Sequence, residues 1–180
     1  MVFKKIFVAI DRSVHSSLVC EQALEIAQLQ HSQLMLFHAL RWTTQEPTGP
    51  FMGIGTLADI DLYNSSKRVR QELLQEEMEK VKSWLSAYCQ QATAKGIRAE
   101  FDCHVGDAGS WICDLASNWG ADLIVLGRRG HKGLSEIVLG SVSNYVMHHA
   151  PCSVLVVQGE ASPTIEPPVA GNQVNTSGRK

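Results

Sequence analysis

The chain of 180 residues has little net charge and no long apolar run. A net charge of -2 gives no long-range attraction to nucleic acid or to an anionic membrane surface. No apolar run reaches the ~20 residues that a membrane-spanning helix needs. The apolar stretch at residues 6–10 is too short for a signal peptide and is not followed by a small-residue cleavage site. We therefore expect a soluble, cytoplasmic protein that contacts neither nucleic acid nor membrane.

The chain also has no paired cysteine motif. Its five cysteines form no C-x-x-C pair, and an odd number without metal-ligand spacing argues against both a disulfide scaffold and a zinc site. We expect them to be buried, reduced thiols, and we expect the protein itself to hold no metal ion. The cysteines are Cys20, Cys89, Cys103, Cys113 and Cys152.

Short apolar stretches alternate with amphipathic ones along most of the chain. The apolar stretches predict strands at 6–10, 34–40, 97–104, 121–126 and Ser153–Val157. Helical spacing predicts helices at Ser16–Gln30, 64–95, 110–119 and Ser141–His149. Strands that alternate with helices are typical of an α/β fold, so we predict a three-layer sandwich with a five-stranded parallel sheet.

Two segments depart from this alternation. Residues 41–63 carry several prolines and glycines, and loops of that length are usually functional or mobile. Trp42 and Phe51 in this loop could cover a ligand or pack at a dimer surface, and the sequence does not choose between the two. Residues 159–180 are rich in Pro, Gly, Ser and Thr and should form a disordered tail, which leaves one domain at 1–158.

One glycine pattern points to phosphate binding. Gly127, Gly130 and the pair Gly140-Ser141 form G-x2-G-x9-G-S, between a predicted strand and a predicted helix. Glycine lets backbone N–H groups approach phosphate oxygens closely, and a helix N-terminus offers unpaired N–H donors with partial positive charge. The serine hydroxyls at 141 and 143 could add donors. A simple chain-reversing turn is the alternative, but the cations Arg128, Arg129 and Lys132 favour an anion site.

Asp11 follows the first predicted strand and is the second candidate ligand contact. Ligands of open parallel sheets bind beyond the carboxyl ends of the strands, which places Asp11 beside the glycine pattern. An aspartate at this point is also a common turn or N-cap residue. We expect ligand contact here.

These segments resemble the universal stress protein family over residues 2–158. The resemblance rests on the glycine pattern with the segment that follows it, and on the stretches at 6–13, 121–127 and 150–157. The spacing G-x2-G-x9-G-[ST] is typical of the ATP-binding branch of that family. The resemblance implies a Rossmann-like fold of the adenine nucleotide alpha hydrolase type, with sheet order 3-2-1-4-5. It also implies a homodimer, and ATP bound without a well-defined reaction.

The resemblance also assigns site residues. It implies that the glycine pattern, Arg129 and the start of the last helix bind phosphate and ribose. It also implies that adenosine contacts the end of the first strand and that adenine contacts the end of the second strand. Mg²⁺ or Mn²⁺ could enter with the phosphates. The residues are Ala9, Ile10, Asp11, Ala39, Leu126, Gly127, Arg129, Gly130, Gly140, Ser141, Val142 and Ser143.

Two positions depart from the family pattern. The family often has Gly-x-Pro after the third strand, where this chain has Gly106-Asp107-Ala108, so a ligand contact from that loop has less support. A small residue is common where this chain has Arg128, and an extra cation there could raise phosphate affinity or select another anion.

The function expected from these residues is that of a nucleotide-dependent regulatory or stress-response protein with a protein partner not named by the sequence. The chain lacks the P-loop pattern G-x-x-x-x-G-K-[ST], and phosphoryl transfer needs a positioned metal and a nucleophile-orienting group. We therefore expect at most slow ATP hydrolysis, and whether ATP is hydrolysed at all stays open.

Three alternatives are kept. An adenylyl- or phosphoryl-transferring enzyme of the related α/β group would carry an H-x-G-H-type signature after the first strand, which this chain lacks. A sensor of AMP or a cyclic nucleotide would use the same site. A dimer that binds no nucleotide would lack the glycine pattern. Dimerisation itself is expected through Ser153–Val157, because a bare apolar edge strand invites pairing about a two-fold axis.

Overall fold

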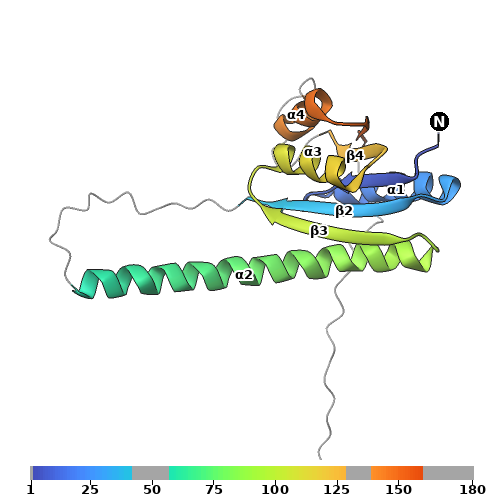
Figure 1. The fold of residues 1–180 in the computed structure, drawn as a ribbon. Helices are drawn as coiled ribbons and strands as arrows, with labels where there is room; N and C mark the ends of the chain where they lie inside the picture. The colour runs from blue at the N-terminus through green and yellow to red at the C-terminus, as the bar shows by residue number, and fades with distance from the viewer. Residues whose placement is uncertain (1, 42–56, 129–138, 160–180) are drawn as a thin grey trace, which may run out of the picture.

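Helices and strands alternate throughout the part of the chain that the structure describes (Figure 1). The computed structural model describes residues 2–41, 57–128 and 139–159, with the backbone alone for 57–64. The elements are β1 (Lys5–Ala9), α1 (Ser16–Gln30), β2 (Gln33–Leu40), α2 (Leu57–Ala94), β3 (Ala99–Val105), α3 (Ala108–Trp119), β4 (Leu123–Gly127), α4 (Ser141–His149) and β5 (Ser153–Val157).

The strands form one five-stranded sheet of order β3-β2-β1-β4-β5, in which every pair is parallel. This confirms the predicted architecture and strand order. In the centre, Ile6 of β1 lies opposite Leu34 of β2 on one side and Leu123 of β4 on the other. The strand order therefore reverses between β1 and β4, and crevices at such reversals hold ligands in open α/β sheets.

Helices cover both faces of the sheet, which explains why the strands are apolar on both sides. Ile6 and Val8 face one layer, which contains α1 and the C-terminal half of α2. Phe7, between them, faces the opposite layer, which contains α3 and α4. Ile6, Phe7 and Val8 are fully buried, as expected for a central strand between two helical layers.

Helix α2 begins earlier than the sequence predicts. The predicted loop at 41–63 overlaps it, because α2 starts at Leu57. Residues 57–63 contain no glycine or proline, whereas those residues are concentrated at 47–55, so the helix can extend backwards until they begin. Residues 42–56, which include Trp42 and Phe51, lie outside the described part of the chain, and so do residues 160–180 of the predicted tail.

The N-terminal half of α2 projects past the sheet (Figure 1). A helix of 38 residues is ~57 Å long, whereas the eight residues of β2 span ~26 Å. Val81 and Leu85 are fully buried, but Val69 and Leu73 are 55% and 51% exposed. The C-terminal part of α2 therefore packs on the sheet, whereas Val69 and Leu73 belong to the part that extends past it.

The cysteine expectation is confirmed in part. All five thiols are free, but Cys113 and Cys152 are only partly buried, unlike Cys20, Cys89 and Cys103. Phe101 of β3, an edge strand of the sheet, is 36% exposed.

Candidate functional site

A cavity of about 590 Å³ lies at the carboxyl edge of the sheet. Its walls come from the ends of β1, β2 and β4 and from the starts of α1, α3 and α4. This volume is in the usual range for a site that encloses a small molecule. The lining residues are Ala9, Ile10, Asp11, Arg12, Ser13, His15, Ser16, Val19, Phe37, His38, Ala39, Leu40, Arg41, Ala108, Ile112, Leu126, Gly127, Leu139, Gly140, Ser141, Val142 and Ser143.

The cavity brings together every predicted site residue that the structure describes. Ala9 ends β1, and Ile10 and Asp11 follow it directly. Ala39 comes from β2, and the rest come from the end of β4 and the start of α4. Arg129 and Gly130 lie outside the described residues. Segments separated by more than a hundred residues therefore meet at one place, as the sequence argument requires.

Backbone hydrogen bonds hold the two described ends of the glycine segment against each other. The Gly140 N–H donates to the Arg128 carbonyl at 2.9 Å, and the Arg128 N–H donates to the Val157 carbonyl of β5 at 2.9 Å. The first bond closes the segment between β4 and α4, and the second anchors it to the sheet. The start of α4 is thereby fixed beside the end of β4.

The N-terminus of α4 offers backbone donors to the cavity. Gly140 is the N-cap residue, with φ -61° and ψ 155°, and among the residues that the structure describes no side chain caps this helix. The first N–H groups of a helix have no carbonyl partner within it and carry partial positive charge. Ser141 and Val142 belong to this first turn and line the cavity, which makes the turn suited to an anion.

Ser143 departs from its expected role as a hydroxyl donor to phosphate. Its side chain is 2% exposed, and its Oγ lies 2.9 Å from both the Arg128 and the Gly140 carbonyl oxygens. A hydroxyl has one proton to donate, and here it serves the backbone. Ser143 therefore braces the turn, and the hydroxyl left for a ligand in this helix start is that of Ser141.

Asp11 is both a turn residue and a cavity residue. Its Oδ1 accepts hydrogen bonds from the Ser13 N–H at 3.0 Å and from the Ser16 hydroxyl at 3.0 Å, and the same hydroxyl contacts the Asp11 carbonyl. This is an Asx turn at the start of α1. The turn fixes the carboxylate at the cavity wall, so the two interpretations of Asp11 are compatible.

His38 is a cavity residue that the sequence reasoning did not assign to the site. Its ring is 8% exposed, and its Nδ1 donates to the Ile10 carbonyl at 2.9 Å. The ring also packs edge-on against Trp84 of α2, with centroids 5.5 Å apart. His38 thereby ties the end of β1 to β2 and α2. The signal for it was a polar residue inside an otherwise apolar strand.

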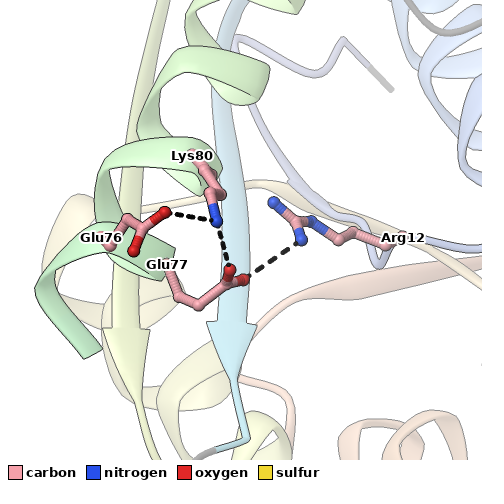
Figure 2. A network of polar contacts seen from close by, with 4 residues as sticks. All are labelled: Arg12, Glu76, Glu77 and Lys80. Atoms are coloured by element: carbon pink, nitrogen blue, oxygen red, sulfur yellow. Dashed lines mark hydrogen bonds and ion pairs between the residues drawn. The ribbon is translucent and has the colours of Figure 1, made fainter. Parts of the chain in front are cut away.

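Arg12 and Arg41 add cations to the cavity wall, and neither was predicted. Figure 2 shows that Arg12 extends toward α2, where its Nη1 lies 3.5 Å from the Glu77 Oε2. Lys80 bridges Glu76 and Glu77 at 2.9 Å each. Lys80, followed by the weaker effect of Arg12, lowers the pKa of the Glu77 carboxyl. Both side chains of the Arg12–Glu77 pair are in contact with solvent, so Arg12 can leave Glu77 at little cost.

The loop after β3 contributes less, in line with its departure from the family pattern. Ala108 lines the cavity, whereas Val105 and Gly106 do not. Asp107 caps α3 by accepting from the Ser110 N–H at 2.9 Å and from its hydroxyl at 3.0 Å. These bonds, more than the nearby Arg41, lower the pKa of the Asp107 carboxyl.

The described residues hold no cluster of three or more His, Cys, Asp or Glu that could bind a metal ion. Among the same residues, no helix is long and apolar enough to cross a membrane.

The comparisons with known proteins agree on one family. Residues 2–158 match the model of the Universal stress protein family. Universal stress protein Sll1388 of Synechocystis is 41% identical over 166 residues, covering 88% of this chain and 99% of that protein.

Two solved structures share the fold. A universal stress protein in complex with cAMP aligns with a TM-score of 0.59 at 24% identity, covering 88% of this chain and 99% of that one. A universal stress protein of Archaeoglobus fulgidus in complex with dAMP aligns with a TM-score of 0.52 at 23% identity, covering 88% and 100%.

Proposed function

Because the chain belongs to the universal stress protein family, we propose that it binds ATP at the carboxyl edge of its sheet and acts as a nucleotide-dependent regulatory protein in the stress response. The observation that carries the proposal is the cavity of about 590 Å³ that collects the predicted residues of three strand ends and the α4 N-terminus. The relatives solved with cAMP and dAMP support an adenine nucleotide as the class of ligand.

In this proposal the two halves of the nucleotide meet different walls. The base lies against the backbone near Ala39, and adenosine contacts Ala9, Ile10 and Asp11. The phosphates lie at the α4 N-terminus near Gly140 and Ser141, with Arg129 and Gly130 of the intervening segment as further contacts. Apolar groups such as Phe37 and Ile112 suit a flat base, and unpaired N–H groups suit an anion.

A divalent cation, Mg²⁺ or Mn²⁺, would enter with the phosphates, since the described residues offer no metal cluster of their own. Hydrolysis in this proposal is at most slow, because the chain lacks the P-loop pattern G-x-x-x-x-G-K-[ST]. ATP occupancy would change the affinity of a protein partner, which is the regulatory output.

Isothermal titration calorimetry with ATP tests the site. Gly140→Asp places a carboxylate at the helix N-cap, where the phosphates would lie, and should abolish binding. Ser83→Asp adds the same charge at an exposed position of α2 and is the matched control, expected to bind like wild type. Equal affinity for ATP in wild type and Gly140→Asp would overturn the assignment of the site.

A second candidate is a sensor of AMP or a cyclic nucleotide, which the relative solved with cAMP favours. Titration of AMP and cAMP against the same protein decides between the two candidate functions. The working ligand should be the one whose affinity gives the highest occupancy of the site at its cellular concentration. Native mass spectrometry of freshly purified protein gives an independent answer, because a retained nucleotide adds a defined mass. If chromatography of the products shows that the protein converts ATP rapidly, that result would instead support a transferase.

The quaternary proposal is a homodimer through β5. This strand forms one edge of the sheet, and its residues Val154 to Val157 are only partly buried. Pairing two such edges about a two-fold axis would hide both. The free thiols are compatible with the proposed cytoplasmic location, where cysteines stay reduced.

A further inference from the structure

Arg12 connects the proposed nucleotide site to helix α2. It follows Asp11 directly and lines the cavity. Its side chain extends to α2, where the Nη1 lies 3.5 Å from the Glu77 Oε2 (Figure 2). The two residues are 65 positions apart in the chain. Arg12 is therefore a cation of the cavity wall that pairs with a carboxylate from a distant element.

This pair is weaker than the one that Glu77 forms with Lys80. The Lys80 Nζ lies 2.9 Å from the Glu77 Oε1, closer than the guanidinium of Arg12. Lys80 also lowers the pKa of the Glu77 carboxyl more than Arg12 does. Glu77 therefore keeps a cation when Arg12 leaves, and no buried charge is stranded.

The sheet brings Arg12 close to the proposed phosphate position. Strands β1 and β4 are neighbours, with Ala9 opposite Leu126, and neighbouring strands lie ~4.8 Å apart. Arg12 comes soon after Ala9, and the Gly140 N–H donates to the carbonyl of Arg128, which comes soon after Leu126. Arg12 and the start of α4 thus lie beyond the ends of two adjacent strands, a separation that a long arginine side chain can span.

We propose that Arg12 is a further nucleotide contact, which exchanges Glu77 for the phosphate chain of the bound nucleotide. This inference rests on the proposed function and adds a residue to its site. A guanidinium can donate two parallel hydrogen bonds to phosphate oxygens, and a polyphosphate carries more negative charge than one carboxylate. Glu77 is then a competitor of the nucleotide for Arg12, and removal of its charge favours the ligand.

Arg41, the other arginine that lines the cavity among the described residues, suits this role less well. It follows the end of β2, which is one strand further from β4 than β1 is. It also helps to lower the pKa of the Asp107 carboxyl, on the side of the cavity away from α4. Adenine, the part of the nucleotide proposed to lie near β2, carries no negative charge that would attract a cation.

Isothermal titration calorimetry with ATP tests the exchange. Arg12→Gln should weaken ATP binding by at least roughly tenfold, ~1.4 kcal/mol, and Arg12→Lys, which keeps the charge, should weaken it less. Glu77→Gln should strengthen ATP binding by roughly twofold or more, because Arg12 no longer leaves a carboxylate to reach the ligand. Glu79→Gln is the matched control, since it removes the same charge from a residue of α2 that pairs with Lys82. It should bind ATP like wild type.

The direction of the Glu77 effect separates this role from a structural one. If the Arg12–Glu77 pair only held the loop after β1 in place, loss of either member would weaken ATP binding. If Arg12 exchanges partners, Glu77→Gln strengthens binding, and it no longer does so in a chain that also carries Arg12→Gln. Circular dichroism checks that all variants fold.

The outcomes distinguish this inference from the proposed function. If wild type binds ATP, Gly140→Asp does not, and Arg12→Gln binds like wild type, the role of Arg12 is overturned and the proposed function stands. A Glu77→Gln variant that binds ATP no more tightly than wild type overturns the exchange. Absence of ATP binding by wild type overturns both.

Discussion

Replacement of Ser143 by alanine tests how the start of α4 is held. The Ser143 hydroxyl is buried and donates to one of two carbonyls, Arg128 or Gly140, each 2.9 Å away. Both carbonyls have a second donor, because Arg128 accepts from the Gly140 N–H and Gly140 accepts from the Asn144 N–H, each at 2.9 Å. The substitution removes one hydrogen bond but leaves neither carbonyl without a partner.

The expected loss of unfolding free energy is therefore that of a single hydrogen bond, ~1 kcal/mol, and not the larger penalty of a stranded buried group. With a urea m-value of ~1–3 kcal/mol/M, the midpoint of unfolding should fall by roughly 0.3–1 M. Since the N–H groups of α4 remain in place, ATP affinity should fall less than tenfold.

Ser141→Ala is the matched comparison, because Ser141 is exposed in the same turn. It should leave the urea midpoint unchanged and weaken ATP binding, the reverse of the pattern at Ser143. A loss above ~3 kcal/mol for Ser143→Ala would mean that the backbone donors do not satisfy the two carbonyls. No loss at all would mean that the hydroxyl does not brace the turn.

Three further outcomes follow from contacts outside this turn. Asp107→Ala should cost ~1 kcal/mol by removing the cap of α3. The pKa of Asp107 in the folded protein lies below its unfolded value of ~3.9. The difference in unfolding free energy between wild type and variant should therefore be full above that pH and should vanish as the pH falls through the folded pKa. A difference that persists in acid would contradict the role of Asp107 as the cap. Gly109→Ala should cost ~1–3 kcal/mol, because the added Cβ would lie 2.7 Å from the Tyr145 ring, and Tyr145→Ala in the same chain should recover part of the loss in a thermal melt. Burial raises the pKa of the Cys89 thiol to about 11, so native protein should resist a thiol reagent there at pH 8 while urea-unfolded protein reacts fully, and rapid native labelling at Cys89 would refute this.

The sheet was predictable because its strands are apolar on both faces. Short apolar runs such as that of β4 are typical of a strand between two helical layers, and their alternation with helices favours a parallel sheet. Ser141–His149 was predictable at both ends, since glycine precedes it and Pro151 follows soon after. Local chemistry determines such boundaries, and no knowledge of tertiary contacts is needed.

The rest depends on distances that a sequence does not contain. The apolar positions Val69 and Leu73 look like core positions, but the length of the neighbouring strands decides which turns of α2 are covered. Arg12 and His38 join the cavity because the ends of β1 and β2 lie side by side, and neither belongs to a motif. Ser143 was assigned to the right turn, but the direction of its hydroxyl is set by two carbonyls of its own segment.

The central position of β1 has a consequence for synthesis of the chain. Ile6 pairs with Leu123, so one side of this strand has no neighbour until more than a hundred further residues have been made. At ~5–20 residues per second that interval is roughly 6–24 s, far longer than a helix or a local strand pair needs to form. The nascent chain can complete the β1-β2-β3 half of the sheet first, with one edge of β1 open. An apolar edge exposed for that long is a target for chaperones and for wrong pairing, and arrival of β4 closes it.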